Sequence, residues 1–332
     1  MNYKTLAEKA LRGEIPSREE CRKVLAVPRE QLLDLLAAAY MVRKAHFDNR
    51  VLLHMILNAK SGLCTEDCSY CSQSAVSSAA IDSYPVLDEE SMVEGAVKAK
   101  EARAIRYCIV ASGQAPGSKE LDRFCRAVTR IKSAVDISIC TSLGFLDASA
   151  ARALKEAGVD RYNHNLNTSR RYYGDICTTH SYQERLETLR NARDAGLELC
   201  CGALFGMGET EDDITDLCFS LRELNPASIP VNFFHPVPGT PLEEVRYLTP
   251  LKCLAILCLV RFINPATEIR VAGGREHHLR MLQPLSLYPA NSLFVSGYLT
   301  TPGQSPQEAW QMVSDMGFEV VQEVSGETAV RY

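Results

Sequence analysis

The sequence predicts an α/β fold, namely a (β/α)8 barrel of the TIM type with an N-terminal helical extension. Two observations predict it. After about residue 50, short apolar runs alternate with longer amphipathic runs, which indicates parallel βα units. Eight such short runs occur, which is the number that closes a barrel. An open doubly wound sheet is the alternative, because a strand count made from sequence is easily wrong by one or two.

The first 50 residues are expected to be helical, because residues 17–20 resemble a capping box and leucines recur over residues 32–36. The expected strands are residues 51–57, 106–111, 135–140, 161–166, 197–205, 228–234, 268–272 and 292–295. The expected helices between them are residues 89–104, 118–131, 148–157, 182–195, 211–224 and 250–262. We therefore expect an extension over residues 1–50 and one barrel domain over residues 51–332, with its chemistry at the carboxyl ends of the strands.

Composition and charge exclude some functions. A net charge of -5 and a pI of about 5.9 argue against nucleic acid or an anionic membrane surface as a partner. The longest apolar run, residues 253–262, is too short to cross a membrane and contains Arg261. The first residues lack the apolar region of a signal peptide, so we expect a cytoplasmic protein. Its thirteen cysteines are then expected to be reduced thiols, metal ligands or catalytic groups rather than disulfides.

Three cysteines follow the first expected strand on one short loop. Cys64, Cys68 and Cys71 have the spacing C-x3-C-x2-C, and Tyr70 precedes the third. Three thiolates can hold three irons of a cubane cluster and leave the fourth iron open. The alternatives are a zinc site or coincidence, but structural zinc needs four ligands and the sequence has no further Cys or His close to this loop. We interpret the loop as an iron–sulfur site.

Three more cysteines, Cys108, Cys140 and Cys200, lie on the second, third and fifth expected strands. A cysteine on a strand is usually a small buried hydrophobic residue. Three of them in one barrel, however, can converge in its lumen. Five others lie on helical runs and are interpreted as packing residues, namely Cys21, Cys125, Cys218, Cys253 and Cys258.

The first loop resembles the signature of the radical S-adenosylmethionine superfamily. This resemblance implies a [4Fe-4S] cluster whose open iron chelates S-adenosylmethionine through its amino and carboxylate groups. Reduction of the cluster then cleaves the sulfonium and yields a 5'-deoxyadenosyl radical. Residues 202–209 are similar to the adenine-contacting motif of that superfamily, which marks Gly206 and Glu209 as cofactor contacts. On its own, this segment is a common glycine-rich turn between a strand and a helix.

Over nearly the whole chain, the sequence resembles the biotin synthase family in particular. The matching stretches are residues 107–108, 139–144, 162–166, 178–185, 232, 238–241, 270–276 and 300–303. The resemblance implies a sulfurtransferase that converts dethiobiotin to biotin. It also implies that the sulfur comes from an auxiliary iron–sulfur cluster held by Cys108, Cys140, Cys200 and Arg270.

The auxiliary site has two unusual features. A guanidinium is protonated and has no lone pair to offer, so Arg270 is assigned on resemblance alone and is otherwise a salt-bridge partner or a donor to cluster sulfide. Cys177 and Cys201 are possible extra thiolates, which would allow a four-iron cluster in place of a [2Fe-2S] cluster. Neighbours on a straight strand face opposite ways, however, so Cys200 and Cys201 should not share one site.

The resemblance also implies contacts with the substrate and the nucleoside. Asn165 and Asn232 match the family's substrate asparagines, and neutral amides suit the ureido head of dethiobiotin. Arg185 matches an arginine that helps bind the S-adenosylmethionine carboxylate. Asn167 stands where an acidic residue often contacts the ribose, and His235 stands where a different residue is usual.

The resemblance further implies a homodimer and an electron donor such as flavodoxin or ferredoxin. The alternatives are another radical enzyme of the same subgroup, or a non-catalytic iron–sulfur carrier or redox sensor. A test of whether the reduced protein cleaves S-adenosylmethionine would separate an enzyme from a carrier.

Overall fold

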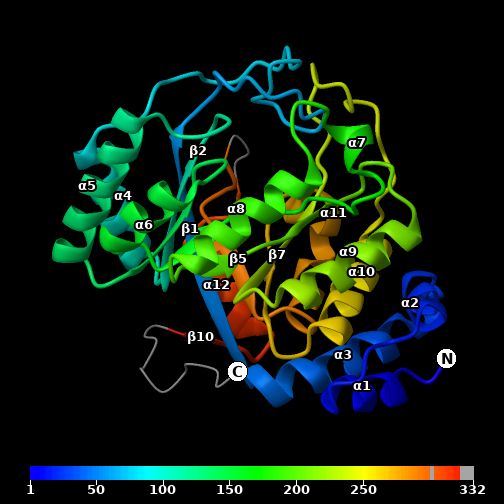
Figure 1. Ribbon diagram of the computed structural model, residues 1–332. Coiled ribbons are helices and arrows are strands. Elements are labelled where there is room, and N and C mark those ends of the chain that lie inside the picture. Colours follow the sequence, from blue (N-terminus) through cyan, green and yellow to red (C-terminus); the bar gives the residue numbers. More distant parts are fainter. Residues whose placement is uncertain (300–302, 322–332) are drawn as a thin grey trace.

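A computed structural model describes residues 1–299 and 303–321. They form the predicted closed parallel barrel with helices around it (Figure 1). The barrel closes because β9 (Ser292–Val295) runs parallel to β1 (Arg50–Lys60), with Leu52 opposite Ser292. The strands between them are β2 (Arg106–Ala111), β3 (Ser138–Ser142), β4 (Arg161–Asn163), β5 (Glu198–Cys200), β6 (Ala203–Phe205), β7 (Ser228–Phe233) and β8 (Glu268–Val271). A short strand, β10 (Glu319–Val320), pairs with the start of β1.

The fifth barrel position is a broken strand, which corrects the continuous strand expected over residues 197–205. Both pieces, β5 and β6, pair with β7. At Gly202, between them, an added Cβ would lie 2.0 Å from the carbonyl oxygen of Pro230 on β7. The backbones therefore approach at a distance that only glycine allows.

Three other expected strands have bounds that differ by two residues or more. β1 continues to Lys60, beyond the expected residue 57. β3 begins at Ser138 rather than residue 135, because the preceding helix α5 (Ser118–Ala134) is longer than expected and Val135 is its C-cap. β4 ends at Asn163 rather than residue 166.

The helices lie outside the barrel and beneath it. Those of the barrel are α4 (Glu89–Glu101), α5, α6 (Ala148–Glu156), α7 (Tyr173–Ile176), α8 (Tyr182–Asp194), α9 (Glu211–Leu224), α10 (Pro250–Ile263), α11 (Arg275–Leu279), η2 (Arg280–Leu287) and α12 (Pro306–Asp315). Those of the extension are α1 (Tyr3–Leu11), α2 (Arg18–Leu25), η1 (Arg29–Gln31) and α3 (Leu32–Phe47). The capping box expected at Ser17 and Glu20 is present at the start of α2.

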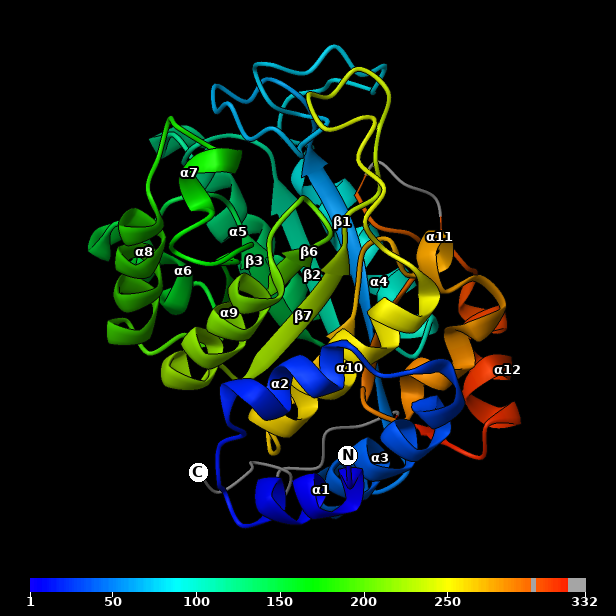
Figure 2. The ribbon, with the colours of Figure 1, turned by 90° about the vertical axis from the view of Figure 1, so that its right-hand side faces the viewer.

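The extension lies against the barrel at the end where the strands begin. Figure 2 shows α1 and α3 below β1, with α2 beside α10. Helix α10 is buried along residues 253–263, because it contacts the extension on one side and other barrel elements on the other. This explains its long apolar run, since a helix that is apolar all round belongs in a core. Among the described residues, no helix combines the length and the apolarity needed to cross a membrane.

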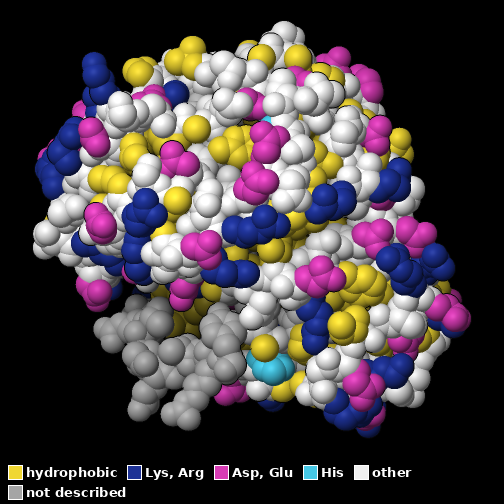
Figure 3. All heavy atoms as spheres, in the orientation of Figure 1, with side chains coloured by type: hydrophobic (Ala, Val, Ile, Leu, Met, Phe, Trp, Pro, Cys, Tyr) yellow, Lys and Arg dark blue, Asp and Glu magenta, His cyan; other side chains and the backbone are white. Residues whose placement is uncertain are grey.

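The outer helices carry charges of both signs. Figure 3 shows Lys and Arg side chains interspersed with Asp and Glu over the face seen in Figure 1. Many are paired, as in the ion pair of Arg126 on α5 with Glu89 on α4 at 2.7 Å. At the opposite end from the extension, the loop after β1 rises above the barrel (Figure 2). That end holds the candidate site.

Candidate functional site

A cavity of about 330 Å³ opens at the carboxyl ends of the strands. This is where the fold places chemistry. Its lining includes most of the sequence-predicted site residues: Cys64, Cys68, Tyr70, Cys71, Asn165, Asn167, Arg185 and Asn232. His235, noted above as a departure from the family, lines it too.

The three cysteines of the first loop all border this cavity. The chain leaves β1 through Gly62 and Leu63, both with positive φ (68° and 56°), and this turn directs the loop over the barrel. Within the loop, the N–H of Cys71 donates to the carbonyl of Cys68 at 3.1 Å. Three thiols beside an open cavity fit a cubane cluster with three protein ligands and one iron left for a ligand in the cavity.

A second segment, residues 177–180, packs against the first loop. The carboxylate of Asp67 accepts hydrogen bonds from the backbone N–H groups of Thr178 (2.9 Å) and Thr179 (3.2 Å). This contact brings Cys177 Sγ to 3.7 Å from Cys68 Sγ, with His180 beside it. A further Cys and a His therefore do lie near the loop, although nothing near it in the sequence indicated them. The two cysteines are 109 positions apart.

Tyr70 and Asn167 contact each other at the edge of the cavity. The Asn167 amide donates to the Tyr70 hydroxyl at 2.5 Å. Burial raises the pKa of Tyr70 well above its ordinary value, so the phenol stays protonated. Asn167 has a φ of 66°, and its carbonyl accepts from the N–H of Leu204 on β6 at 2.8 Å. The pair thus links the first loop to the fifth barrel position.

Arg185, on α8, is buried and reaches the cavity rather than the surface. Its Nη1 donates to the Asn165 carbonyl at 3.0 Å, its Nη2 donates to His180 Nε2 at 2.9 Å, and its Nε contacts the Tyr173 hydroxyl. These contacts fix a cation at the wall of the cavity.

The glycine-rich turn after β6 is organised by its own glutamate. The Glu209 carboxylate accepts from the backbone N–H groups of Gly206 (2.6 Å), Met207 (2.8 Å) and Gly208 (3.1 Å). Leu204 of the same motif lines the cavity, whereas Gly206 and Glu209 do not. In this structure, Glu209 shapes the turn between β6 and α9 and does not contact the cavity.

The two asparagines expected to bind substrate are held by backbone groups. Asn165 Oδ1 accepts from the N–H of Gly202 at 3.0 Å. Asn232 Nδ2 donates to the Ala203 carbonyl at 2.9 Å, and its Oδ1 accepts from the N–H of Gly273 at 2.9 Å. Both amides are therefore fixed in orientation where they face the cavity.

Deeper in the lumen, the three strand cysteines converge. Cys108 lies opposite Cys140 across the β2–β3 pair, and with Cys200 they pack in one small buried cluster. All three line a second cavity of about 140 Å³, together with Arg270. This donor set fits a small iron–sulfur cluster enclosed by the strands.

The two cavities share lining residues, among them Asn163, Asn165 and Tyr298. Asn163 Nδ2 also donates to Cys200 Sγ at 3.2 Å. Sequence reasoning missed Asn163 and Tyr298 as site residues. Asn163 could have been predicted from the sequence. It stands two positions before Asn165 at the end of a strand, and residues at i and i+2 share a face. Tyr298 follows β9 and had none.

Arg270 is held as a cation next to the lumen thiols. Its Nε donates to Ser292 Oγ at 3.1 Å, its Nη2 contacts Glu268, and its Nη1 lies 3.8 Å from Cys200 Sγ. Burial alone would lower the pKa of Arg270, but the charge of Glu268 raises it above its ordinary value. A positive guanidinium suits a neighbourhood of thiolates and sulfide.

Glu268 joins several charged groups below the lumen cavity. Its carboxylate accepts from Arg161 at 2.9 Å and lies 3.0 Å from His54 Nε2. Burial, and then the charge of Arg270, lower the pKa of His54 to about 3, so this histidine is neutral. Sequence reasoning missed this network, because its members come from different strands.

Neither proposed extra thiol lies with the lumen group. Cys201 packs in the core outside it, as strand alternation predicted, and Cys177 lies against the first loop. The placement therefore does not support either as a fourth lumen thiol. Of the helical cysteines, Cys125 is half-buried and the other four are buried, as expected for packing residues. Residues 300–302 of the 300–303 stretch lie outside the described residues.

Comparisons with known proteins agree with this geometry. Residues 60–221 match the radical SAM superfamily, and residues 230–319 match the biotin and thiamin synthesis associated domain. The chain is 50% identical to a biotin synthase of Geobacillus kaustophilus over 96% of both chains. It is also 50% identical to one of Bacillus subtilis, over 95% of this chain and 94% of the relative.

Two solved structures share the fold. A methylornithine synthase superposes with a TM-score of 0.85 at 22% identity, covering 95% of this chain and 97% of the other. An FeFe-hydrogenase maturase of Carboxydothermus hydrogenoformans superposes with a TM-score of 0.81 at 21% identity, covering 97% and 80%.

Proposed function

The chain belongs to the biotin synthase family of radical S-adenosylmethionine enzymes, the sulfurtransferases that convert dethiobiotin to biotin, and we propose that its two sets of three cysteines bind iron–sulfur clusters at the two ends of one reaction cavity. Cys64, Cys68 and Cys71 would hold the [4Fe-4S] cluster. The lumen set, Cys108, Cys140, Cys200 and Arg270, would hold the auxiliary cluster. When bound, the first cluster with S-adenosylmethionine supplies the 5'-deoxyadenosyl radical, and the auxiliary cluster supplies sulfur.

One observation carries this assignment: the two cavities share Asn163, Asn165 and Tyr298. A substrate in the shared region would have the first loop on one side and the lumen thiols on the other. The protein's contribution is then positioning, because a radical reaction at an unactivated C–H bond needs its partners held in near contact and away from water.

Named side chains would orient the two small molecules. Arg185 would bind the S-adenosylmethionine carboxylate, and Tyr70 with Asn167 would border its nucleoside. Asn165 and Asn232 would bind the ureido head of dethiobiotin, since their amides are already oriented by backbone partners. Gly206 and Glu209 would act indirectly. Their hydrogen bond would hold β6 and the turn after it in place, and the Glu209 side chain would not touch the nucleoside.

The auxiliary cluster is proposed to be [2Fe-2S] with Arg270 beside it. Among the described residues, three thiols line the lumen cavity, and Cys177 and Cys201 lie elsewhere. This arrangement favours the two-iron form over a four-iron variant with a fourth thiolate. Counts of iron and sulfide per chain after anaerobic purification test the proposal.

Three further properties are proposed on the family resemblance. The chain would be cytoplasmic, would receive electrons from a flavodoxin or ferredoxin, and would act as a homodimer. All thirteen cysteines are free thiols in the structure, which supports a reducing compartment. Residues 51–332 would form one catalytic domain carrying the extension of residues 1–50. Sedimentation tests the dimer, and reduction by flavodoxin tests the donor.

The reaction itself is tested on the reconstituted, reduced protein under anaerobic conditions. S-Adenosylmethionine and dethiobiotin are added, and products are identified by mass spectrometry. We expect biotin together with 5'-deoxyadenosine. 5'-Deoxyadenosine without biotin would contradict the assigned substrate. Neither product from protein with intact clusters would favour an iron–sulfur carrier or sensor.

A further inference from the structure

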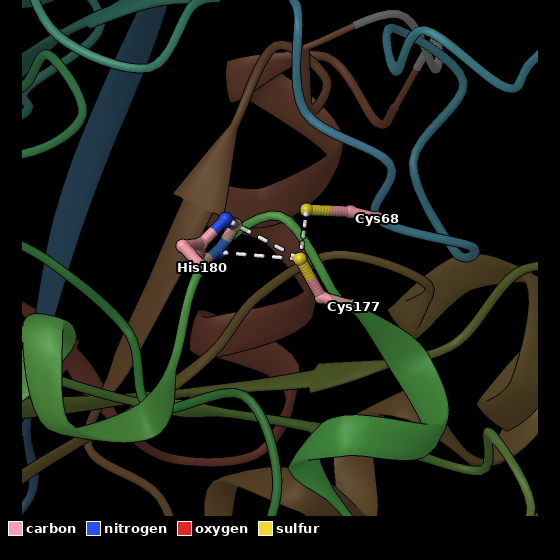
Figure 4. Close-up of side chains that lie close together, drawn as sticks. All are labelled: Cys68, Cys177 and His180. Carbon is pink, nitrogen blue, oxygen red and sulfur yellow. Dashed lines mark hydrogen bonds between the residues drawn. The ribbon is translucent and has the colours of Figure 1, made fainter.

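Cys68, Cys177 and His180 form a buried group of three possible metal ligands beside the first loop. Their ligand atoms all lie within 4.8 Å of one another. Figure 4 shows Cys68 entering from the loop after β1, while Cys177 and His180 come from the segment between α7 and α8. Of the three, the cluster assigned above uses Cys68 alone.

The distance between the two sulfur atoms of this group matches one tetrahedral ion rather than a cubane. Two thiolates bound to one metal through bonds of about 2.3 Å stand about 3.8 Å apart, and a thiolate and an imidazole nitrogen stand about 3.5 Å apart. Cys68 Sγ and Cys177 Sγ are 3.7 Å apart, and Cys177 Sγ is 3.6 Å from His180 Nε2 and 3.3 Å from His180 Nδ1, so coordination through Nε2 also requires the imidazole ring to turn.

The outer contacts of His180 decide which nitrogen is available. Its Nδ1 lies 2.5 Å from Glu66 Oε2, so Nδ1 carries the hydrogen and Nε2 has the lone pair. A carboxylate behind the imidazole is the usual support of a metal-binding histidine, because it fixes the tautomer and the ring. Glu66 and His180 are both buried, so the arrangement is not a passing surface contact.

Arg185 covers this lone pair in the structure. Its Nη2 donates to His180 Nε2 at 2.9 Å. An ion at Nε2 takes the place of Nη2, so Arg185 must turn away from His180, and because its guanidinium is rigid and planar its contacts with Asn165 and Tyr173 shift with it. The charges of the group then balance. The dication is neutralised by the thiolates of Cys68 and Cys177, and the guanidinium of Arg185 is offset by the carboxylate of Glu66.

We propose that the cluster-free chain binds one thiophilic divalent cation of the zinc class through Cys68 Sγ, Cys177 Sγ and His180 Nε2. Binding releases the two thiol protons to solvent and leaves a fourth position for water. Because Cys68 belongs to both sites, this ion and the [4Fe-4S] cluster exclude each other. The site therefore competes with cluster assembly whenever the first loop is empty.

The test uses the full chain, freed of iron and kept anaerobic, with Co²⁺ as a coloured probe of tetrahedral thiolate sites. Because the lumen thiols can also take up Co²⁺, we expect the parent chain to bind one Co²⁺ more than Cys177→Ser does, and one equivalent of Zn²⁺ to displace it. Cys177→Ser and His180→Gln should each weaken binding at least tenfold, and Glu66→Gln about tenfold, because supporting partners contribute about 10- to 100-fold in affinity. Cys201→Ser, another buried thiol, is the matched control and should bind as the parent does.

Unchanged Co²⁺ binding by Cys177→Ser, together with its loss in Cys64→Ser or Cys71→Ser, would overturn the proposal, because the ion would then sit on the three-cysteine loop. X-ray absorption of the Zn²⁺-loaded parent chain removes any dependence on how the variants fold. Two sulfur ligands with imidazole scattering support the site, and three sulfur ligands overturn it.

Competition is measured separately, by the return of cluster absorbance during reconstitution. Zn²⁺ added first should slow this return in the parent chain and much less in Cys177→Ser. Equal slowing in both chains would contradict the shared-ligand argument. Neither experiment contains S-adenosylmethionine or dethiobiotin, so its outcome is independent of the proposed function.

Discussion

Cys200 and Cys201 are adjacent in the sequence but lie on opposite sides of the barrel wall. Cys200 packs with Cys108 and Cys140 in the lumen, whereas Cys201 packs in the core outside it. Successive side chains of an extended strand alternate in this way. The pair therefore provides a matched comparison. Both residues are buried cysteines at neighbouring positions, and only Cys200 faces the proposed auxiliary cluster.

We predict that Cys200→Ala lowers the iron content by the share of the auxiliary cluster and abolishes biotin formation, because a lumen ligand is lost. Cleavage of S-adenosylmethionine should continue, since the first loop is untouched. Cys201→Ala should keep the full iron content and lose only about 1 kcal/mol of folding free energy, a common cost for a small buried truncation. Iron analysis and product assays check both. Loss of iron in Cys201→Ala alone would reverse the assignment.

The features that the sequence predicted are those set by local periodicity. Alternating strand and helix patterns predicted the barrel, and strand alternation separated Cys200 from Cys201. The break at Gly202 was missed, because it depends on the approach of Pro230 from another strand. The contact of Cys177 with Cys68 was missed for the same kind of reason, since it joins loops that follow different strands.

Tyr70→Phe is predicted to weaken the binding of S-adenosylmethionine more than it slows turnover. The change removes the hydroxyl that accepts from the Asn167 amide and leaves that amide without this partner. A neutral hydrogen bond contributes about 1 kcal/mol, which corresponds to a rise of roughly five- to tenfold in KM. Steady-state kinetics with varied S-adenosylmethionine measure it.

Tyr172→Phe is the control for that variant, because the Tyr172 hydroxyl donates to the Met207 carbonyl at 3.1 Å and the residue does not line the main cavity. It should leave KM unchanged. An unchanged KM in Tyr70→Phe as well would mean that the Tyr70–Asn167 contact has no part in nucleoside binding.

Glu268→Gln is predicted to destabilise the fold strongly. The carboxylate is buried and pairs with Arg270 and Arg161, so its loss removes the carboxylate partner of buried Arg270 and leaves Arg161 with Glu198 alone. Breaking a buried ion pair from one side typically costs about 3–5 kcal/mol. Glu198→Gln is the matched control, since Glu198 also pairs with Arg161 but is half exposed, and an exposed pair contributes about 1 kcal/mol or less. Urea denaturation compares them, and equal losses would contradict the argument.

Asp213→Asn is predicted to destabilise the chain in a pH-dependent way. Asp213 lies in the first turn of α9, where its carboxylate accepts from Ser169 Oγ at 2.6 Å, Arg171 Nε at 2.9 Å and Thr210 N at 2.9 Å. Burial alone would raise the pKa of Asp213, but these hydrogen bonds outweigh it and lower the pKa below its ordinary value. The charged form is thus favoured more in the folded chain than in the unfolded chain.

The sign of the pH dependence follows. A depressed pKa in the folded state gives stability that is fully present above the unfolded pKa of about 3.9 and is lost as the pH falls below it. The stability difference between the parent and Asp213→Asn should be about 1–3 kcal/mol at pH 7 and should shrink only below about pH 5. Urea midpoints over falling pH measure it, with Asp216→Asn, an exposed partner of Arg18, as the control expected to change little. A difference that grows in acid would show that Asp213 does not stabilise the chain as an anion.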